Sequence, residues 1–518
     1  MKLASLLTLA TFLTGLPAFA GDYYFAAASA GSNSGADCAD AYAYNDGTNG
    51  WNTGGKQVAG NTLHWCGSIT ASANANLLNI THSGTSTSPL TIKFEAGASM
   101  HAPYFSSSAG AITGSNISYV VIDGGTNGTI SNTANGTNLA NHQNSYGVEL
   151  TSCTNCEIRN LIISNIYVNA GASSGATDGS GANTACILIN KNSTSTNIHN
   201  NTVSQCKTGI QLAIDNAGDA SNAQIDNNSI SDMDWGINAG GGDSGDTANN
   251  LSIFGNTITN WTNWQFPTNY YHQDGIILFN VGNPTAGIIA NIHDNYIYGD
   301  LGVGSPTGFV YCADFSSCTI YNNLLVNTGH VIYGIMWLGQ GNNFGKNMYV
   351  YNNTIVGVSS RDVCIMLNIS GTSAIENNIC TGPSGMFVYS TYHTTLASFV
   401  ATVATSNSND WNVGTGNAWG SQATGSTASY ATWKASGYEA NSVQTSPNLS
   451  SSYQLQSGSP AIGLGANLTG LGITALDTGM GGVARAASGA WDAGAYNFSS
   501  GGGLIPPTPP PSTTASVQ

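Results

Sequence analysis

Charge is scarce in this chain, and positive charge is scarcer still. Charged residues make up 7% of the 518 residues, with ten Lys plus Arg against 26 Asp plus Glu and a net charge of −16. Nucleic acids and anionic membrane surfaces are bound chiefly through Lys and Arg, so neither is an expected partner. An acidic polysaccharide is also repelled unless a cation such as calcium bridges it to the protein.

Long apolar runs are lacking except at the start of the chain. Met1-Lys2 is followed by an apolar stretch from Leu3 to Leu16, and Pro17-Ala18-Phe19-Ala20 ends in an Ala-x-Ala cleavage site. The stretch is too short to span a bilayer, so residues 1–20 are interpreted as a signal peptide. We therefore expect a soluble protein without a membrane span, secreted to the outside or to the cell surface.

Cysteine is present in an amount that fits export. Ten cysteines in an exported chain are paired more often than free. No set of Cys and His has the spacing of a zinc site, which is the alternative. Sequence proximity suggests the pairs Cys38–Cys66, Cys153–Cys156, Cys186–Cys206, Cys312–Cys318 and Cys364–Cys380.

The length of the chain exceeds the usual limit of about 300 residues for a single core, which favours either several domains or a solenoid. The 41% apolar content and 23 tyrosines provide enough buried surface to argue against disorder.

A sequence repeat favours the solenoid over several domains. Its pattern is an apolar residue, two polar residues, Asn, any residue and an apolar residue, first seen in Ile198-His199-Asn200-Asn201-Thr202-Val203. The recurring Asn residues are Asn201, Asn228, Asn256, Asn295, Asn323, Asn353 and Asn378.

Each repeat also holds a strand that begins with Gly or Cys. The next and third-next residues are apolar or aromatic, which is the period-two pattern of a strand with one face inside. The expected inward pairs are Val148/Leu150, Ile187/Ile189, Ile210/Leu212, Ile237/Ala239, Ile276/Leu278, Phe309/Tyr311, Ile335/Trp337 and Ile365/Leu367. Short strands at a constant period stack into a parallel β-helix, in which the Asn side chains bond from coil to coil. We interpret these Asn residues as structural.

These repeats resemble the secreted right-handed parallel β-helix proteins of the pectate-lyase-like superfamily. Ser118-Tyr119-Val120-Val121-Ile122-Asp123-Gly124-Gly125 resembles an early coil, and Gly60-Asn61-Thr62-Leu63-His64-Trp65-Cys66 resembles the N-terminal cap of such proteins. The resemblance implies an all-β fold and a polysaccharide partner but no particular activity, since this fold carries lyases, hydrolases and adhesins. The expected parts are a cap at 21–80, the β-helix at 81–390, a C-terminal capping segment at 391–498 and a disordered Pro/Thr-rich tail at 499–518.

Two features are expected on the outside of the helix. The outward column of the Gly-led strands becomes apolar late in the stack, at Ile277, Val310, Met336 and Met366. Residues 395–403 have helix-like apolar spacing and are the expected cover for that column.

The richest stretch for chemistry is the one long coil, residues 261–274. Long loops on rigid scaffolds are where function concentrates. Trp261, Trp264, Tyr270 and Tyr271 are expected to stack on sugar rings, with Tyr333 from a later coil. His272 and Asp274 precede a strand that can hold them rigidly. The competing interpretation is a loop packed on its own aromatics.

Neighbouring coils add titratable groups at the same corner. Adjacent coils place such groups about 5 Å apart and alternate coils about 10 Å apart, which brackets the carboxylate separations of glycosidases. Asp234 and Asp274 are thus a candidate acid/base pair for a hydrolase. A lyase would instead use Lys207, His272 or Arg361 to remove a proton beside a uronic acid carboxylate.

A second candidate site is acidic. Asp215 and Asp219 follow one strand, and Asp243 and Asp246 follow the next. Stacked loops bring these carboxylates together, and calcium suits clustered oxygen ligands on flexible loops. The competing interpretation is a solvated acidic turn.

The sequence predicts a monomeric, secreted, carbohydrate-active protein that cleaves an extracellular polysaccharide as a glycoside hydrolase or a polysaccharide lyase. The alternative is a non-catalytic glycan-binding surface or adhesion protein. The aromatic loop with its His and Asp favours the first, and the Pro/Thr-rich tail favours the second.

Overall fold

The computed structural model describes most of the chain between Ala20 and Ser499. The described ranges are 20–53, 55–136, 139–166, 184–241, 245–261, 273–280, 288–302, 306–312, 315, 317–329, 334–339, 347–358, 363–382, 388–390, 393–413, 417–421 and 423–499. The predicted signal peptide and tail therefore lie almost wholly outside the described residues.

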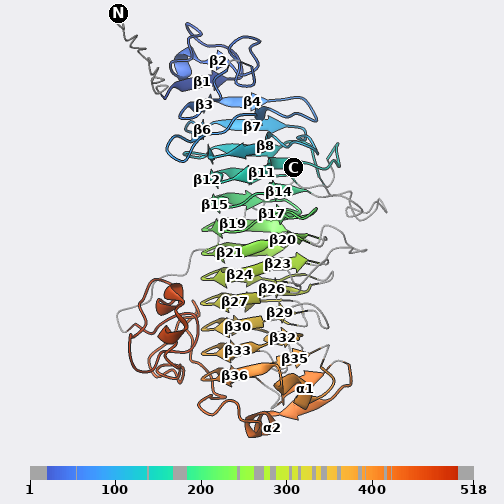
Figure 1. Ribbon diagram of the computed structural model, residues 1–518, viewed down its shortest axis with the longest axis vertical. Helices are drawn as coiled ribbons and strands as arrows, with labels where there is room; N and C mark the ends of the chain where they lie inside the picture. Colours follow the sequence, from blue (N-terminus) through green and yellow to red (C-terminus); the bar gives the residue numbers. More distant parts are fainter. Residues whose placement is uncertain are drawn as a thin grey trace, which may run out of the picture.

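The chain winds as a right-handed parallel β-helix with three strands in each coil (Figure 1). Each strand pairs in parallel with the strands one coil before and one coil after it, and in the described residues the one antiparallel pair between named strands is β38 with β39. Three long sheets result, called here sheets I, II and III. The predicted fold class is confirmed.

Sheet I holds 14 strands. In order they are β2 (Tyr42–Ala43), β1 (Asp22–Ala26), β3 (Thr62–Cys66), β6 (Leu90–Phe94), β9 (Val120–Asp123), β12 (Glu157–Arg159), β15 (Asn197–His199), β18 (Gln224–Asp226), β21 (Ala248–Phe254), β24 (Ile288–His293), β27 (Ser317–Tyr321), β30 (Asn347–Tyr351), β33 (Ser373–Glu376) and β36 (Val403–Asn407).

Sheet II holds 12 strands. They are β4 (Ser68–Thr70), β7 (Ser99–Ala102), β10 (Thr129–Asn132), β13 (Ile162–Ser164), β16 (Thr202–Ser204), β19 (Ser229–Met233), β22 (Thr257–Trp261), β25 (Tyr296–Gly299), β28 (Leu324–Asn327), β31 (Thr354–Val356), β34 (Ile379–Thr381) and β37 (Asp410–Asn412).

Sheet III holds 13 strands. They are β5 (Leu78–Ile80), β8 (Ile112–Ser118), β11 (Tyr146–Thr154), β14 (Ala185–Asn190), β17 (Thr208–Ala213), β20 (Trp235–Gly241), β23 (Asp274–Asn280), β26 (Gly308–Cys312), β29 (Met336–Leu338), β32 (Ile365–Leu367), β35 (Val388–Ser390), β38 (Asn417–Ser421) and β39 (Thr427–Ser429). Stacking in the three sheets thus extends beyond residues 81–390 at both ends.

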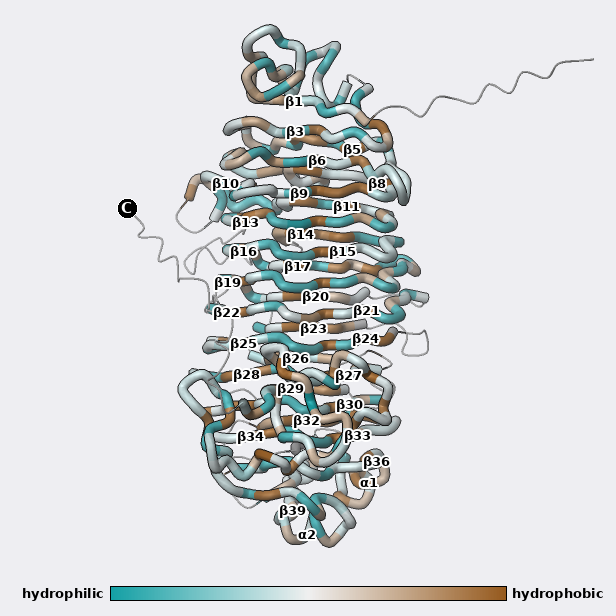
Figure 2. The backbone as a smooth tube through the Cα atoms, turned by 90° about the vertical axis from the view of Figure 1, so that its left-hand side faces the viewer, coloured by the Kyte–Doolittle hydropathy of each residue, from teal (hydrophilic) through white to brown (hydrophobic). Residues whose placement is uncertain are grey.

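One apolar core runs the length of the solenoid. Residues such as Ile225, Ile230 and Ile237 come from the three strands of one coil and are fully buried. Strand side chains alternate between the core and the outside, as in the buried and half-buried positions of β6. Hydrophobic and hydrophilic residues follow one another along the coils (Figure 2). A solenoid lengthens by repeating this cross-section, so the core extends with each added coil.

The Asn column forms the predicted hydrogen-bonded ladder at the corner between sheets I and II. The Asn256 side chain accepts from Asn228 Nδ2 at 3.0 Å and donates to Asn295 Oδ1 at 3.0 Å. It also donates to the carbonyl of Ile225 at 2.9 Å. Because the same bonds recur from Asn201 to Asn378, the structural interpretation of these residues is confirmed.

Register in sheet III corrects two of the predicted inward pairs at Tyr311 and Trp337, while Phe309 and Ile335 are fully buried as predicted. Val310 pairs with Ile276 and Met336 pairs with Val310, and both lie inside. Tyr311 pairs with Ile277 and Trp337 pairs with Tyr311, on the outward face. The reason is that Phe309 and Ile335 occupy the corner position that other coils fill with Gly or Cys. Counting from Gly308 and Gly334 therefore starts one residue too early. The outward column is Ile277, Tyr311, Trp337 and Met366.

The two short α-helices, α1 (Leu396–Val400) and α2 (Tyr430–Ala435), close the C-terminal end of the core. Phe399 of α1 is fully buried and packs 6.1 Å from Trp419 and 5.8 Å from Trp433, measured between ring centroids. The expected helix is confirmed. Its expected place over the outward column of sheet III is wrong, because its apolar side chain covers the open end of the stack.

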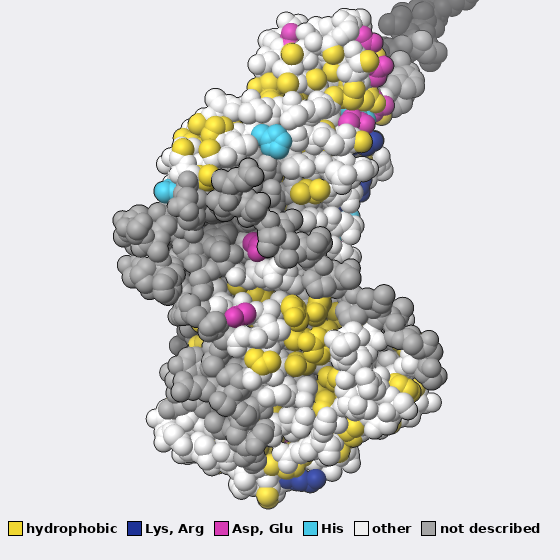
Figure 3. Space-filling view, turned by 180° about the vertical axis from the view of Figure 1, so that it is seen from behind, with side chains coloured by type: hydrophobic (Ala, Val, Ile, Leu, Met, Phe, Trp, Pro, Cys, Tyr) yellow, Lys and Arg dark blue, Asp and Glu magenta, His cyan; other side chains and the backbone are white. Residues whose placement is uncertain are grey.

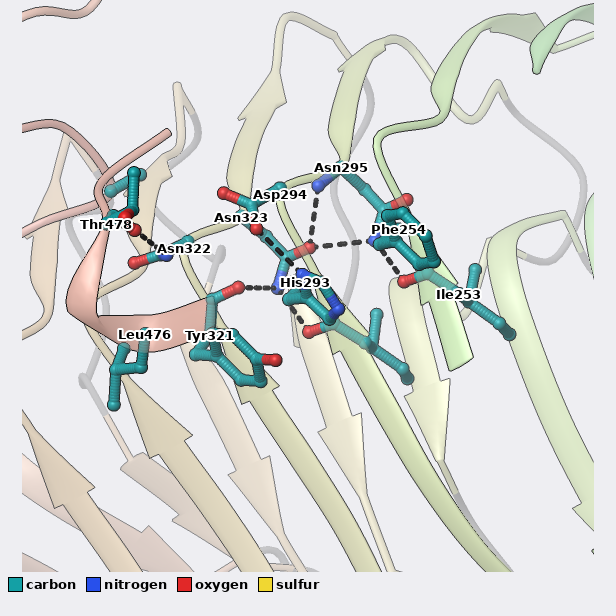
Figure 4. A network of polar contacts seen from close by, with 12 residues as sticks. Ile253, Phe254, His293, Asp294, Asn295, Tyr321, Asn322, Asn323, Leu476 and Thr478 are labelled. Atoms are coloured by element: carbon teal, nitrogen blue, oxygen red, sulfur yellow. Dashed lines mark hydrogen bonds and ion pairs between the residues drawn. The ribbon is translucent and has the colours of Figure 1, made fainter. Parts of the chain in front are cut away.

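The segment from Asn448 to Phe498 returns along the outside of sheets I and II. It contains the 3₁₀ turns η2 (Thr469–Leu471) and η3 (Thr474–Asp477), and another such turn, η1 (Cys38–Asp40), lies near the N-terminus. Asn322 Nδ2 donates to the Thr478 carbonyl at 2.7 Å, and Leu476 packs in the same cluster as Tyr321 (Figure 4). The segment thus covers late coils of the solenoid.

All ten cysteines pair as predicted, including Cys38 with Cys66 near the N-terminus. Disulfides persist in oxidising compartments, so five of them fit an extracellular protein. None of the described helices is long and apolar enough to cross a membrane.

Candidate functional site

The predicted corner residues do assemble at the start of sheet III. Lys207, Asp234 and Gln273 directly precede β17, β20 and β23, on three consecutive coils. The Asp234 amide donates to the Lys207 carbonyl at 3.1 Å, and the Asp274 amide donates to the Asp234 carbonyl at 3.0 Å. The stacking of coils therefore brings Lys207, Asp234 and Asp274 together.

These side chains are buried rather than displayed. Asp234 and Asp274 have no exposed surface, and Lys207 is 2% exposed. The Asp274 carboxylate accepts a hydrogen bond from the Thr307 hydroxyl, and Lys207 Nζ lies 5.1 Å from the centre of the Trp235 ring. Water has little access to the corner in this arrangement, and the catalytic assignments stay predictions.

Only one of the predicted sugar-stacking aromatics is described. Trp261 is half-buried, stacks on Phe309 with ring centroids 5.3 Å apart, and donates from Nε1 to the Asp274 carbonyl at 2.8 Å. It therefore helps to fix the corner. His272, Arg361, Trp264, Tyr270, Tyr271 and Tyr333 lie outside the described residues.

The two acidic loops do stack on one another. The Thr247 amide donates to the Gly218 carbonyl at 2.9 Å, which joins the loop after β20 to the loop after β17. Asp215 is exposed, Asp219 is half-buried and Asp246 is fully buried, while Asp243 lies outside the described residues. Within the described ranges no group of three His, Cys, Asp or Glu side chains is placed to hold a metal. Calcium binding stays a prediction.

The outward face of sheet III carries a strip of side chains that the sequence reasoning largely missed. We call it the sheet III strip. Its central column, in register from coil to coil, is Thr113, Glu149, Leu188, Gln211, Asn238, Ile277, Tyr311, Trp337 and Met366. Early coils contribute mainly polar groups and late coils contribute rings and apolar groups.

The late half of the strip is an aromatic cluster. Ile277 and Tyr311 pack with the half-buried Trp235, Phe279 and Trp337. The rings of Tyr311 and Trp337 meet edge to face with centroids 5.2 Å apart. Apolar side chains also gather at the surface on the half of the solenoid that the late coils build (Figure 3). Such patches on soluble proteins commonly mark binding sites.

The early half of the strip contains one carboxyl group, that of Glu149. Its side chain is half-buried, and Oε2 is shielded from solvent without a hydrogen-bond partner among the described residues. Burial raises the pKa of Glu149 above its ordinary value. Burial, with a smaller contribution from Glu149, also raises the pKa of the neighbouring Tyr146 to about 12.

A second missed feature is a charged column on the outward face of sheet I. Arg159 bonds Asp123 at 3.0 Å and Glu157 at 2.5 Å, and His199 Nε2 lies 2.9 Å from the same oxygen of Glu157. Asp226 follows on the next coil. The sequence signal was available, because Asp123, Arg159, His199 and Asp226 each directly follow the buried Ile of a repeat. Their mutual pairing makes this column a structural network.

Comparison with known proteins gives little beyond the fold. No family model matches the chain, and no curated protein matches it. Two solved structures are similar. A rhamnogalacturonan lyase is 12% identical with a TM-score of 0.47, covering 69% of this chain and 87% of its own. The pectate lyase Pel9A is 12% identical with a TM-score of 0.47, covering 93% of this chain and 97% of its own. The fold assignment rests on the sheets and registers described above.

Proposed function

We propose that this protein is a secreted carbohydrate-active protein that cleaves an extracellular polysaccharide laid along the sheet III strip. The observation that carries the proposal is the strip itself, in which polar groups and aromatic rings follow one another in a single column. Aromatic rings pack on the apolar faces of sugars, and amide or carboxyl groups bond sugar hydroxyls. A polymer that crosses successive coils, about 4.8 Å apart, meets both kinds of group in turn.

The corner of Lys207, Asp234 and Asp274 supports cleavage rather than binding alone. It lies where β17, β20 and β23 begin, so it borders the middle of the strip. Titratable groups beside a binding surface are the usual place for acid/base chemistry. His272 and Arg361 belong to the same proposal through their positions in the sequence.

A panel of polysaccharides tests the proposal with two measurements on each glycan. Affinity electrophoresis reports binding, and a reducing-end assay reports cleavage. Retarded migration with new reducing ends supports the proposal. Binding without new ends supports the alternative of a glycan-binding adhesion protein, and no binding to any glycan contradicts both.

The ring of Trp337 should matter most in the late half of the strip. Trp337→Ala is expected to weaken binding of the best glycan about tenfold, because a lost sugar–ring contact costs about 1–2 kcal/mol. Tyr104→Ala is the matched control, since Tyr104 is a half-buried aromatic in a turn outside the strip. Equal affinity of the Trp337→Ala variant and the unmodified protein would remove the strip as the binding surface.

A further inference from the structure

The charge on the sheet III strip is unusual for a surface that binds a polymer. Along the described central column of the sheet III strip there is one carboxylate residue, Glu149, and no lysine or arginine, while Asp274, in register with the outward Trp235, is fully buried. The remaining polar positions are hydroxyls and amides, such as Thr113, Gln211 and Asn238. The strip therefore offers hydrogen-bonding groups and rings but no positive charge of its own.

The described cations lie outside the central column of the strip. Lys207 borders the strip, but it is buried against the Trp235 ring, and Lys191 is exposed directly after β14. Lys93 and Arg159 lie on sheet I, and Arg485 is buried in the C-terminal segment. The remaining Lys and Arg residues are Lys56 near the N-terminus, Lys434 in α2, and Lys2, Lys346 and Arg361 outside the described residues.

Glu149 makes the early half of the strip unfavourable for an anionic ligand. Its neighbours on the adjacent strands of the sheet are Thr113 and Leu188, neither of which carries charge. Tyr146 is the titratable group on its own strand. No described cation therefore offsets the Glu149 carboxylate, and a second carboxylate placed beside it would be repelled in a partly desolvated site.

From this charge pattern we infer that the bound polysaccharide is built of neutral sugars without carboxyl groups, and that its cleavage is hydrolysis rather than β-elimination. The inference rests on the proposed function and narrows it. Neutral sugars need the hydroxyl, amide and ring contacts that the strip provides. A polyuronate presents a carboxylate on every sugar and needs a cation near each one.

The two reactions differ in what they require of the substrate. In β-elimination a base removes the proton beside a uronate carboxylate, a carbon–carbon double bond forms and the glycosidic oxygen leaves. That step needs a uronic acid unit whose carboxyl group is neutralised by a cation or by esterification. In hydrolysis the bond between the anomeric carbon and the bridging oxygen breaks, a water oxygen bonds to that carbon, and a proton from the water ends on the bridging oxygen. Only hydrolysis is open to a glycan whose sugars carry no carboxyl or carboxyl-ester group.

A comparison of neutral and acidic glycans tests this inference. Neutral arabinan, galactan, xyloglucan and mannan are compared with polygalacturonate and alginate, the last two with and without calcium. The expected result is binding and new reducing ends with neutral glycans and no rise in absorbance at 235 nm, the sign of an unsaturated product. A 235-nm rise on a polyuronate would overturn the inference and leave the proposed function standing. Absence of binding to every glycan would overturn both.

Charge reversal at Glu149 supplies a second measurement. Glu149→Lys is expected to strengthen binding of polygalacturonate about tenfold, because it replaces repulsion by attraction in the early half of the strip. The affinity of the Glu149→Gln variant for polygalacturonate should lie between those of the unmodified protein and the Glu149→Lys variant. Gln224→Lys, which adds a positive charge to the exposed outward face of sheet I, is the control and should leave the affinity unchanged. Equal gains from Glu149→Lys and Gln224→Lys would show that only net charge matters and would contradict the inference.

Discussion

Replacing Asn256 by alanine is expected to lower the free energy of unfolding by about 4 kcal/mol, because several buried polar groups lose their partners at once. The Asn256 side chain accepts from the amide and the Nδ2 of Asn228 and donates to two carbonyls and to Asn295 Oδ1, all within 3.1 Å. Urea unfolding followed by circular dichroism measures the effect.

The position of Asn256 makes the test specific. In a solenoid each coil is held only by its neighbours, so one defective coil weakens the contact on both sides. Asn291→Ala is the control, because Asn291 is half-buried on the outward face of sheet I and outside the ladder. If the two variants lose equal stability, the ladder contributes no more than any other polar position.

The features of the fold that depend on residues close together in the sequence were predictable, and those that depend on contacts between distant residues were not. The alternating apolar residues and the repeated Asn are local features, and each predicts the same coil independently. They predicted the stacking and the ladder, and the proximity of the cysteines in the sequence predicted the disulfide pairs. The error at Phe309 and Ile335 has a different origin. Whether a corner position holds Gly or a large residue depends on the space around it, and here Phe309 is accommodated by stacking on Trp261 from the previous coil.

The candidate site was less predictable because its parts come from many coils. The predicted corner residues Lys207, Asp234 and Asp274 lie on consecutive coils and are joined by backbone hydrogen bonds, but Asp274 is in register with Trp235 and not with Asp234. Their burial was not visible in the sequence. Glu149, Gln211 and Trp337 share one column only once the register is known, and a one-residue error moves a side chain to the opposite face. The sequence signal was present, but it needed the correct register to be read.

A pH-dependent weakness is expected at the C-terminal end of the solenoid, at Asp410. Asp410 follows Asn409, which ends the described Asn ladder, and its side chain has no exposed surface. Oδ2 is buried without a hydrogen-bond partner among the described residues, and the Thr445 amide donates to Oδ1 at 3.4 Å. Burial, only partly offset by that amide, raises the pKa of Asp410 from 3.8 to about 7.

The sign of the effect follows from proton binding. Between about pH 4 and pH 7 the folded protein keeps the Asp410 proton that the unfolded chain has released, so stability falls as pH rises through this window. A shift of about three units corresponds to about 4 kcal/mol at most. Below about pH 4 Asp410 is protonated in both the folded and the unfolded protein, and its full contribution to the free energy of unfolding is present. Above about pH 7 it is ionised in both, and that contribution is lost.

Asp410→Asn keeps the shape of the side chain and removes its ionisation. The variant is expected to be more stable than the unmodified protein by several kcal/mol at pH 8 and nearly equal to it at pH 4, because only the ionised carboxylate is costly to bury. Urea unfolding followed by tryptophan fluorescence, which includes the buried Trp411 and Trp419, measures this difference across the pH range. Asn412→Ala on the same strand removes a hydrogen bond to Thr381 but no charge, so its effect should be the same at both pH values. A gain for Asp410→Asn that does not change between pH 4 and pH 8 would show that the Asp410 carboxyl is not held protonated in the folded protein.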